Sequence, residues 1–471
     1  MSFNVNVFGK TLTFDKRVSL LSLLEGVPDA DKYICAKVNN RVRELAYEVY
    51  YDCEVEFLDL TDHEAVRIYA TCLRYLVAMA FKRCYPDLNI RMSYDVSRCI
   101  FVSLIGDQYQ ATTAMYLRIK HEMEAIVEAD YPFNRMVVSN EKAIEIYRAN
   151  GLYDKEEILD YRQEKTVHLY ECDGFIDYNY QVMVPSSKYL KTWKLRLYAP
   201  GFMIQYPRSE CGGEIPEFQE SPTFGRVLKE SDNWQTIVDL RTVARINDSL
   251  KANGPVDFIN IAEARHSRQL AEIGQMIQDD IHTIRLICVA GPSSSGKTTF
   301  ANRLRTELLS RGIRPLRISI DDYYKSRDES PVTDDGDVDW ESIHALDLDQ
   351  FNQDMFDLIS GKEVTLPRFD FITGQRVPGR TVKVGEDEPI IIEGIHALNE
   401  TLTPSIPKNK KFKIFIAPMA QINLDDHNPI SLTDLRLIRR IVRDKKFRGA
   451  SAEETLSMWP MVRKGEFTWI Y

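Results

Sequence analysis

One loop constrains the fold of this chain more than any other feature. Five apolar residues, 286–290, run directly into a loop of small residues that ends in a lysine, and a helical pattern begins at Thr298. Small residues let the backbone N–H groups of such a loop point inward around phosphate oxygens, and the helix N-terminus adds partial positive charge. Lys297 adds a mobile cation, and Thr298 adds a hydroxyl placed to ligate Mg²⁺. The predicted ATP-binding residues are Gly291, Pro292, Ser293, Ser294, Ser295, Gly296, Lys297, Thr298 and Thr299.

The segments around this phosphate loop (Gly291–Thr298) predict the fold class. The alternative is a chance match in a Gly- and Ser-rich segment. Such a match would not be expected to have a strand before the loop and a helix after it. Short apolar runs that alternate with helices are typical of a parallel sheet covered by helices on both faces. The sequence therefore predicts an α/β P-loop NTPase domain over residues 281–471. The strand-like runs are 284–290, 316–320, 390–393 and 413–416, and the helical patterns are 298–311 and 348–360.

Carboxylates follow two of these predicted strands. Asp321 and Asp322 come directly after the run 316–320, and Glu393 follows 390–392. Ligands of open α/β sheets bind at the carboxyl ends of the strands, so these acids are expected beside the phosphates. We predict that Asp321 accepts the proton of an acceptor hydroxyl, and that Thr298, Glu393 and Asp321 form the Mg²⁺ site. The alternative is that acids after strands only form turns and caps.

A basic amphipathic helix is predicted near the C-terminus, over residues 434–448. Aliphatic residues recur along one side of it and arginines at i, i+4 and i+7 along another. Arginines over an ATP site stabilise charge on the transferring phosphoryl group, although a solvated helix has the same pattern. The aliphatic residues are Leu435, Ile438 and Val442, and the arginines are Arg436, Arg440 and Arg443.

The first 280 residues predict two further α+β domains and a connector. Residues 1–60 contain strand-like runs with a short helical stretch, and 61–206 begin with a helix capped by Thr61 or Asp62. A segment rich in Pro, Gly, Ser and Glu then leads into a helical connector, and together they form a linker over 207–280. The net charge of −10 argues against a protein that mainly coats nucleic acid. There is no CxxC pair among eight cysteines, and no apolar run approaches the ~18 residues of a membrane span. These features predict a cytoplasmic protein with reduced thiols.

Taken together, the C-terminal motifs resemble the uridine kinase and phosphoribulokinase family, and most closely its uridine kinase branch. Besides the phosphate loop, the similar runs are Ser319–Lys325, Ala345–Leu348, Leu366–Phe371, Ile392–Gly394 and Asp434–Asp444. The resemblance implies transfer of the γ-phosphate of ATP to the 5′-hydroxyl of a nucleoside. It implies Asp321 as the base and Lys297, Arg439 and Arg443 as catalytic cations, the two arginines acting from a lid. The implied nucleoside-binding residues are Glu341, Phe369, Phe371, Arg376 and Arg436.

Two departures from the family pattern concern the base of the nucleoside. Uridine kinases commonly have a His beside the pyrimidine where this chain has Gly374. The segment 340–344, Trp-Glu-Ser-Ile-His, also differs from the usual Phe-Asp-His-Pro-Asp. Both departures leave the phosphate machinery intact, so the identity of the base stays open.

The N-terminal half resembles threonyl-tRNA synthetases. Residues 1–60 are similar to their ubiquitin-like TGS domain, and 61–206 to their second, editing-type domain. Editing there depends on an HxxxH pair and on a downstream Cys and His, and the corresponding residues here do not serve as metal ligands or general bases in that way. We therefore expect the fold to be kept without its site. The similar runs are Phe81–Pro86, Tyr131–Arg135, Lys142–Tyr147 and Val184–Lys191, and the replaced site residues are Thr71, Tyr75, Asn179 and Met183.

The combined prediction is a cytoplasmic phosphotransferase that depends on ATP and Mg²⁺ and acts on uridine or a related nucleoside. One alternative is an RNA-binding regulatory protein in which the P-loop domain is a nucleotide switch. Another is a sugar-phosphate kinase of the phosphoribulokinase type. The N-terminal half is expected to contact RNA or tRNA, no membrane partner is expected, and homo-oligomerisation is left open.

Overall fold

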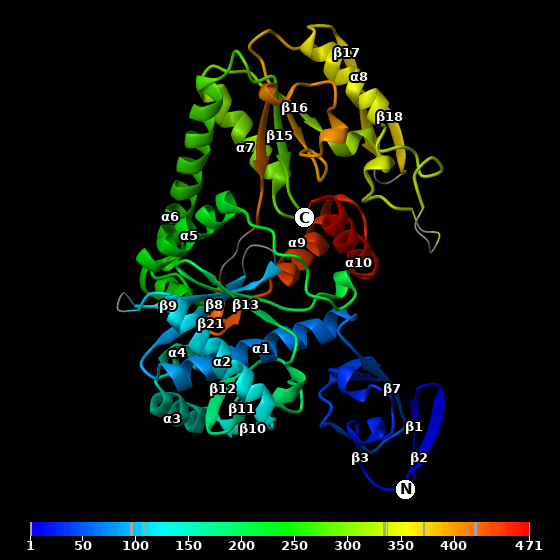
Figure 1. Cartoon of the computed structure of the whole chain (residues 1–471). Coiled ribbons are helices and arrows are strands. Elements are labelled where there is room, and N and C mark those ends of the chain that lie inside the picture. Colours follow the sequence, from blue (N-terminus) through cyan, green and yellow to red (C-terminus); the bar gives the residue numbers. More distant parts are fainter. Residues whose placement is uncertain are drawn as a thin grey trace. The chain divides into compact units, whose positions relative to one another are not determined.

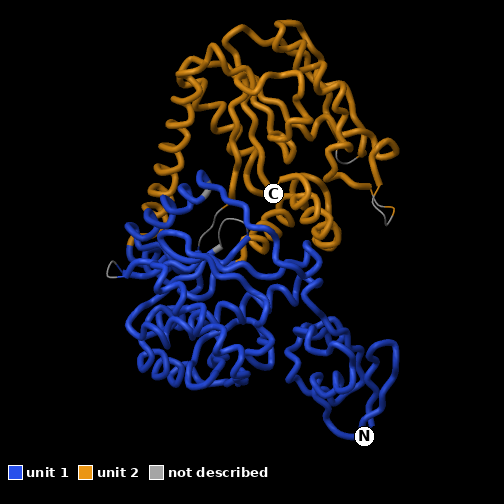
Figure 2. The backbone as a smooth tube through the Cα atoms, in the orientation of Figure 1, with its two compact units in different colours: residues 1–252, 421–430 blue, residues 253–420, 431–471 orange. Residues whose placement is uncertain are grey.

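The chain forms two compact units, shown in Figure 2. A computed structural model describes residues 2–94, 98–106, 109–332, 336, 338–370, 373–418 and 422–470. Unit 1 holds residues 1–252 and 421–430, and unit 2 holds 253–420 and 431–471. The segment 421–430 lies in the predicted kinase domain but belongs to unit 1, which the sequence did not indicate. None of the described helices is long and apolar enough to cross a membrane.

Unit 1 begins with a five-stranded sheet in the order β2-β1-β7-β4-β5. Figure 1 labels β1, β2 and β7 of this sheet. Buried and exposed residues alternate in β1 and β7, because one face of this sheet packs on a core and the other faces solvent. These strands agree with the α+β fold class predicted for the N-terminal part of the chain. The strands are β1 (Phe3–Val7), β2 (Lys10–Phe14), β4 (Cys35–Val38), β5 (Arg41–Arg43) and β7 (Cys53–Leu58), with a smaller pair β3 (Val18–Ser19) and β6 (Glu48–Val49).

Helix α1 (His63–Cys84) is central to the rest of unit 1. Asp62 caps it, as predicted, and its carboxylate accepts the N–H groups of Glu64 and Ala65. Residues on all sides of α1 are buried, because it packs against helix α2 (Thr113–Ala129) and a four-stranded antiparallel sheet. That sheet has the order β13-β14-β9-β8, and a separate sheet has the order β10-β11-β12. The strands of the two sheets are β8 (Asn89–Tyr94), β9 (Ile100–Ile105), β10 (Asn134–Ser139), β11 (Thr166–Cys172), β12 (Phe175–Tyr178), β13 (Lys194–Tyr198) and β14 (Gly201–Gln205). Helices α3 (Asn140–Asn150) and α4 (Tyr153–Leu159) follow β10 in the sequence.

Two helices make up the connector between these sheets and the phosphate loop. They are α5 (Pro222–Ile237) and α6 (Val243–Asp279). Helix α6 is interrupted at Gly254, whose φ of 74° lies in the left-handed region that glycine tolerates, and Pro255 follows without an N–H to donate. The boundary between the units, after residue 252, falls beside this interruption.

Unit 2 contains a fully parallel sheet in the order β16-β19-β15-β20, which confirms the α/β class. The central strand β15 is buried along its whole length and contributes alternate residues to two cores. Leu286 and Cys288 pack in the core that includes α8, while Ile287 and Val289 pack with α7 and the end of α6. Helices therefore cover both faces of the sheet. Its elements are β15 (Leu286–Ala290), α7 (Lys297–Ser310), β16 (Leu316–Ser319), α8 (Leu348–Ile359), β19 (Ile390–Glu393) and β20 (Lys411–Phe415).

A hairpin and two C-terminal helices complete unit 2. Strands β17 (Val364–Asp370) and β18 (Gln375–Val382) pair antiparallel. Helix α9 (Leu432–Phe447) is the predicted basic helix, and Ser431 caps its first turn. Helix α10 (Ala452–Trp469) begins with a capping box between Ser451 and Glu454.

Residues 423–429 form a small hairpin of β21 (Asn423–Asp425) and β22 (Asn428–Pro429) that is anchored in unit 1 by buried charges. Lys155 Nζ lies 2.8 Å from Asp425 Oδ1 and 3.1 Å from Asp177 Oδ1. His427 Nδ1 lies 2.6 Å from the other oxygen of Asp177. Although burial alone would raise it, Lys155 and His427 hold the pKa of Asp177 at about 2. This Lys155 cluster (Lys155, Asp177, Asp425, His427) keeps its charges paired in the interior.

Replacing Lys155 by Met should strongly destabilise unit 1. We expect the free energy of unfolding to fall by about 3–5 kcal/mol, because two carboxylates would stay buried without their cation. Urea unfolding followed by circular dichroism would measure the loss in the transition of unit 1. The matched control is Lys142→Met, which removes an exposed ion pair with Glu145 and should cost less than about 1 kcal/mol. Similar small losses in both variants would contradict the role of the cluster.

Candidate active site

The phosphate loop connects the end of β15 to the start of α7, as its sequence predicts. Gly291 must be glycine, because a Cβ there would lie 2.5 Å from the carbonyl oxygen of Ile416. Gly296 has a φ of 100° and Ser294 a φ of 58°, so the loop turns through left-handed conformations just before the helix. The loop ends with Gly296 as the N-cap residue of α7.

Polar groups of the loop fit a bound phosphate. The hydroxyls of Ser294 and Ser295 are buried and have no hydrogen-bond partner among the residues that the structure describes. Buried polar groups are normally paired, so these two hydroxyls fit the oxygens of an anion at the helix N-terminus. Lys297 Nζ donates to the Pro292 carbonyl at 3.1 Å, and burial lowers the pKa of Lys297. The loop thus combines unpaired donors with a cation held next to them.

Two of the predicted Mg²⁺ ligands, Glu393 and Asp321, lie at the carboxyl ends of neighbouring parallel strands, and the third, Thr298, lies in the first turn of α7. The Thr298 hydroxyl donates to Glu393 Oε1 at 3.1 Å. Burial, followed by the charge of Asp321, raises the pKa of Glu393. Asp321 follows β16, which pairs directly with β19, and its Oδ2 lies 3.6 Å from Arg448. This set of hydroxyl and carboxylate oxygens fits the hard oxygen donors that Mg²⁺ prefers.

Helix α9 turns its arginines, rather than its aliphatic residues, toward the protein interior. Arg436 Nε donates to the Ser293 carbonyl at 3.0 Å, and Arg440 Nη1 donates to the Ser293 hydroxyl at 2.7 Å. Ile438 and Val442, on the opposite side, are 59% and 62% exposed. Buried arginines are tolerated here because the phosphate loop and nearby carboxylates accept their hydrogen bonds. In contrast to an ordinary surface helix, α9 therefore has its arginine side toward the interior and its aliphatic side toward solvent.

The two predicted lid arginines have different environments. Arg439 Nε donates to the Ser294 carbonyl at 3.2 Å, so its guanidinium lies against the phosphate loop. Arg443 Nε instead donates to Asp444 at 2.8 Å, and burial together with Arg448 lowers the pKa of Arg443. Of the two, only Arg439 has a hydrogen bond to the loop among the described residues.

Glu466 of α10 is a site residue that the sequence analysis missed. It is fully buried and accepts the Ser293 N–H at 2.8 Å. The guanidinium of Arg436 also donates to it, as does Arg463 Nη1 at 2.7 Å. A signal was present in the sequence, because Glu466 continues the helical spacing of a buried side of α10. That side contains Thr455, Trp459, Val462 and Glu466.

The predicted nucleoside-binding residues are only partly brought together. Glu341 is buried against α10, where a Cβ at position 465 would lie 2.3 Å from Glu341 Cβ. Burial, with the charges of Glu466 and Asp321, raises the pKa of Glu341 to about 7, against the effect of Arg440. His396, also missed, holds the same segment, with Nε2 at 3.0 Å from the Glu341 carbonyl.

The other predicted nucleoside contacts lie in several environments. Phe369 packs against Tyr324 and Trp340, at centroid distances of 5.6 and 5.9 Å. Arg376 pairs with Asp347 at 2.8 Å. Arg436 is engaged by Ser293 and Glu466 as described above, and Phe371 lies outside the described residues. The nucleoside roles of these side chains therefore stay predictions.

The positions that correspond to the editing site are packed in the core of unit 1. The Tyr75 hydroxyl donates to the carbonyls of Tyr170 and Phe175, at 3.0 and 2.7 Å. The Thr71 hydroxyl donates to a backbone carbonyl of α1, and Met183 is buried. In the part of the chain that the structure describes, no three His, Cys, Asp or Glu side chains are grouped to hold a metal ion.

Comparisons with known proteins identify the family of the C-terminal region. A family model described as "Phosphoribulokinase / Uridine kinase family" matches residues 286–470. The uridine kinase of Mycoplasma genitalium is 30% identical over 174 residues, which are 37% of this chain and 73% of that protein. The chain belongs to the phosphoribulokinase/uridine kinase family. Its C-terminal region is thus a kinase-type phosphotransferase domain.

Other similar proteins match only in part. A threonine–tRNA ligase of Desulforamulus reducens is 29% identical over 167 residues, 35% of this chain and 26% of that protein. The chain therefore spans about a quarter of that ligase's length. A protein of Arabidopsis thaliana named as inorganic pyrophosphatase TTM2 is 29% identical over 194 residues, 40% of this chain and 25% of that protein. Together with the uridine kinase match, the likeness to the ligase confirms that the chain combines these two types of sequence.

Replacing Glu466 by Gln should weaken the attachment of α9 and α10 to the phosphate loop. The guanidinium of Arg436 would remain buried without its counter-charge, so we expect the free energy of unfolding of unit 2 to fall by about 3 kcal/mol or more. Thermal unfolding would measure the loss. Glu453→Gln is the control, because Glu453 is exposed in the first turn of the same helix and its substitution should have little effect on stability. Equal effects of the two substitutions would show that Glu466 does not hold these helices.

Proposed function

We propose that this protein is an ATP-dependent nucleoside kinase that transfers the γ-phosphate to the 5′-hydroxyl of uridine or a related nucleoside. The observation that carries the proposal is the grouping of three features at one sheet edge. Unpaired hydroxyls of the phosphate loop lie at the start of α7, the Thr298–Glu393 pair follows, and Asp321 stands at the end of the adjacent strand. Membership of the phosphoribulokinase/uridine kinase family supports the same reaction class.

The first part of the mechanism is the positioning of ATP. Its β- and γ-phosphates would accept hydrogen bonds from the loop N–H groups, the Ser294 and Ser295 hydroxyls and Lys297. Lys297 would exchange its present hydrogen bond to Pro292 for the phosphates. Arg439, already at the Ser294 carbonyl, would neutralise charge on the transferring group. Thr299 lies in the first turn of α7 and would also contact the phosphates.

The second part is the activation of the acceptor. Asp321 would orient the hydroxyl of the nucleoside and accept its proton, while Arg448 stabilises the charge of Asp321. Thr298, Glu393 and Asp321 would hold Mg²⁺, which when bound neutralises charge on the phosphate oxygens. Transfer would then depend mainly on alignment and electrostatics, because phosphoryl transfer needs little covalent chemistry from the protein.

The acceptor would lie between aromatic and acidic side chains. We assign ring stacking to Phe369 and contact with the ribose hydroxyls to Glu341. With a pKa of about 7, Glu341 has both protonation states available near neutral pH to donate or accept a hydrogen bond. Arg376, Arg436, Arg443 and Phe371 complete the proposed substrate and lid contacts.

A second candidate function follows from the N-terminal likeness to threonine–tRNA ligases. In that proposal unit 1 grips a structured RNA, and unit 2 is a nucleotide switch. A sugar-phosphate kinase remains a third candidate within the family named by the matched model. The eight unpaired cysteines fit a cytoplasmic location under each proposal.

ATP turnover by the purified protein should depend on a free nucleoside. We expect Lys297→Met to abolish turnover with the fold intact, because this side chain faces the phosphates. Asp321→Asn should lower kcat by about two to four decades with little change in ATP affinity. A coupled ADP assay with uridine, cytidine, adenosine, guanosine and ribulose 5-phosphate would measure these effects. Stimulation by structured RNA alone would support the switch, and a near-normal kcat of Asp321→Asn would exclude Asp321 as the base.

Base selectivity should be weaker than in a strict uridine kinase. Gly374 has no side chain to hydrogen-bond the base, and Phe369 stacks on any ring because every base has a π-face. Apolar pockets discriminate by about tens to hundreds, whereas sites that hydrogen-bond the substrate reach about four orders of magnitude. Competition between the four nucleosides would give the ratios of kcat/KM. A preference for uridine above about a thousandfold would show that another residue, such as Gln375 or His344, recognises the base.

A further inference from the structure

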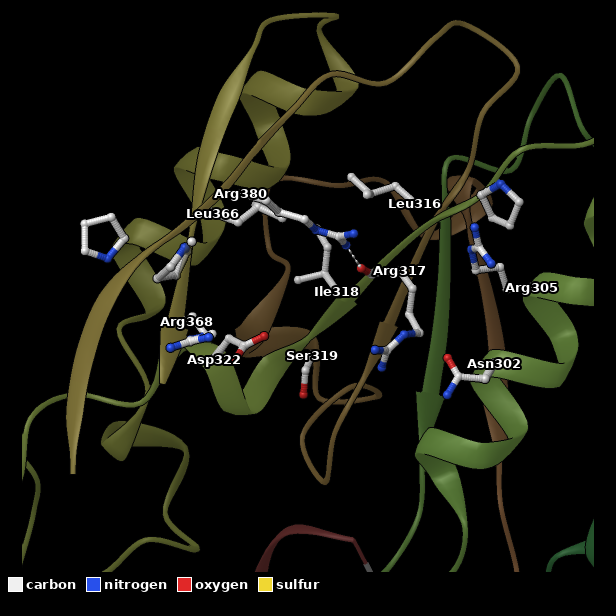
Figure 3. Close-up of a pocket in the computed structure, with 14 residues that line it drawn as sticks. Asn302, Arg305, Leu316, Arg317, Ile318, Ser319, Asp322, Leu366, Arg368 and Arg380 are labelled. Carbon is white, nitrogen blue, oxygen red and sulfur yellow. Dashed lines mark hydrogen bonds between the residues drawn. The ribbon is translucent and has the colours of Figure 1, made fainter. Parts of the chain in front are cut away.

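A cavity of about 870 Å³ lies beside the edge strand β16, on the outside of the parallel sheet (Figure 3). Its walls come from α7, β16 and the β17–β18 hairpin. It is distinct from the proposed acceptor site, because Asp321, Glu341 and Phe369 are not among the residues that line it. Phe369 packs with Tyr324 and Trp340 on one side of β17, and Arg368 lines the cavity on the other.

Four arginines give the cavity a strong positive charge. They come from three elements, Arg305 from α7, Arg317 from β16, and Arg368 and Arg380 from the hairpin, so they approach from both sides in Figure 3. Arg305, Arg368 and Arg380 form no ion pair with any carboxylate that the structure describes. Like charges on separate elements repel one another, so an uncompensated group of this kind favours an anion between them.

Asp322 is the one carboxylate among the residues that line this cavity. Its Oδ1 already accepts the N–H of Phe369 at 3.3 Å. Asp322 therefore offsets only part of the positive charge, and at least two arginines are left without compensation.

The cavity also has an apolar wall. Leu366, Pro367 and Pro378 line it from the hairpin, and Pro315, Leu316 and Ile318 from the side of the sheet. Pockets of about 300–1,000 Å³ accept whole small-molecule ligands, and guanidinium groups bind phosphates through paired N–H donors. A ligand with phosphates at one end and a flat ring at the other would satisfy both walls.

We propose that this cavity is a second nucleotide site, which binds a nucleoside diphosphate or a compound of the same phosphate-and-ring chemistry. It stands apart from the phosphate loop and does not depend on which acceptor the kinase uses. Arg317 links the two regions, because its Nη1 lies 3.4 Å from Glu393 Oε1 at the predicted Mg²⁺ site. A bound phosphate would compete with Glu393 for this guanidinium.

The test is a titration of the full chain with UDP while the other sites are filled. A non-hydrolysable ATP analogue with Mg²⁺ would saturate the phosphate loop, and uridine at saturation would occupy the acceptor site. We expect calorimetry to detect one further equivalent of bound UDP. The affinity for this UDP should fall as the salt concentration rises, because salt screens the charges. The double variant Arg305→Ala/Arg368→Ala should weaken this binding by about tenfold or more, since each guanidinium–phosphate contact is charge-assisted.

The controls separate this site from the others. Arg305 and Arg368 are exposed, so the double variant should keep the thermal unfolding temperature of the wild type. Arg314→Ala removes another exposed arginine that does not line the cavity and should leave UDP affinity unchanged within about twofold. The single charge reversal Arg368→Glu should weaken binding at least as much as the double variant. Failure to detect the extra equivalent of UDP would overturn the proposal, as would equal affinity in the wild type and both cavity variants. If pyrophosphate bound as tightly as UDP, the ring would play no part in recognition, and the assignment of a nucleotide ligand would be wrong.

Discussion

The Ser293 N–H and the guanidinium groups of Arg436 and Arg463 converge on the buried carboxylate of Glu466. Without this negative charge, the guanidinium of Arg436 on α9 would stay buried without its counter-charge, which is strongly unfavourable. Helix α10, which carries this carboxylate, also packs closely on Glu341, where only glycine fits at position 465. One ion pair network thereby sets the positions of the loop, the proposed lid and a proposed acceptor residue.

The sequence predicted those parts of the fold that depend on short segments. The phosphate loop, the parallel strands around it and the cap at Asp62 each follow from neighbouring residues, and the structure confirms them. The acids at the ends of β16 and β19 were found for the same reason, since they are adjacent in sequence to the apolar residues of each strand. Their chemical roles remain proposals that the experiments above address.

Features that depend on distant residues were not predictable in this way. The periodicity of α9 identified a helix with an arginine side, but which side is buried depends on Glu466, 30 residues away. The arginines that line the proposed second nucleotide site do not form a motif in the sequence. Only the fold brings α7, β16 and the hairpin together around this cavity. The hairpin 423–429 has no motif, and its place in unit 1 depends on a lysine of α4.

That hairpin has a consequence for the order in which the protein is made. Asp425 emerges from the ribosome 270 residues after Lys155, its partner in the interior of unit 1. At roughly 5–20 residues per second, the nascent chain waits on the order of 15–50 seconds with Lys155 and Asp177 in place but the third charge still unsynthesised. Unit 1 is thus completed only after the strands of the kinase sheet have been translated, although its own sequence begins the chain. Truncation between residues 253 and 420 would leave this N-terminal unit permanently unfinished.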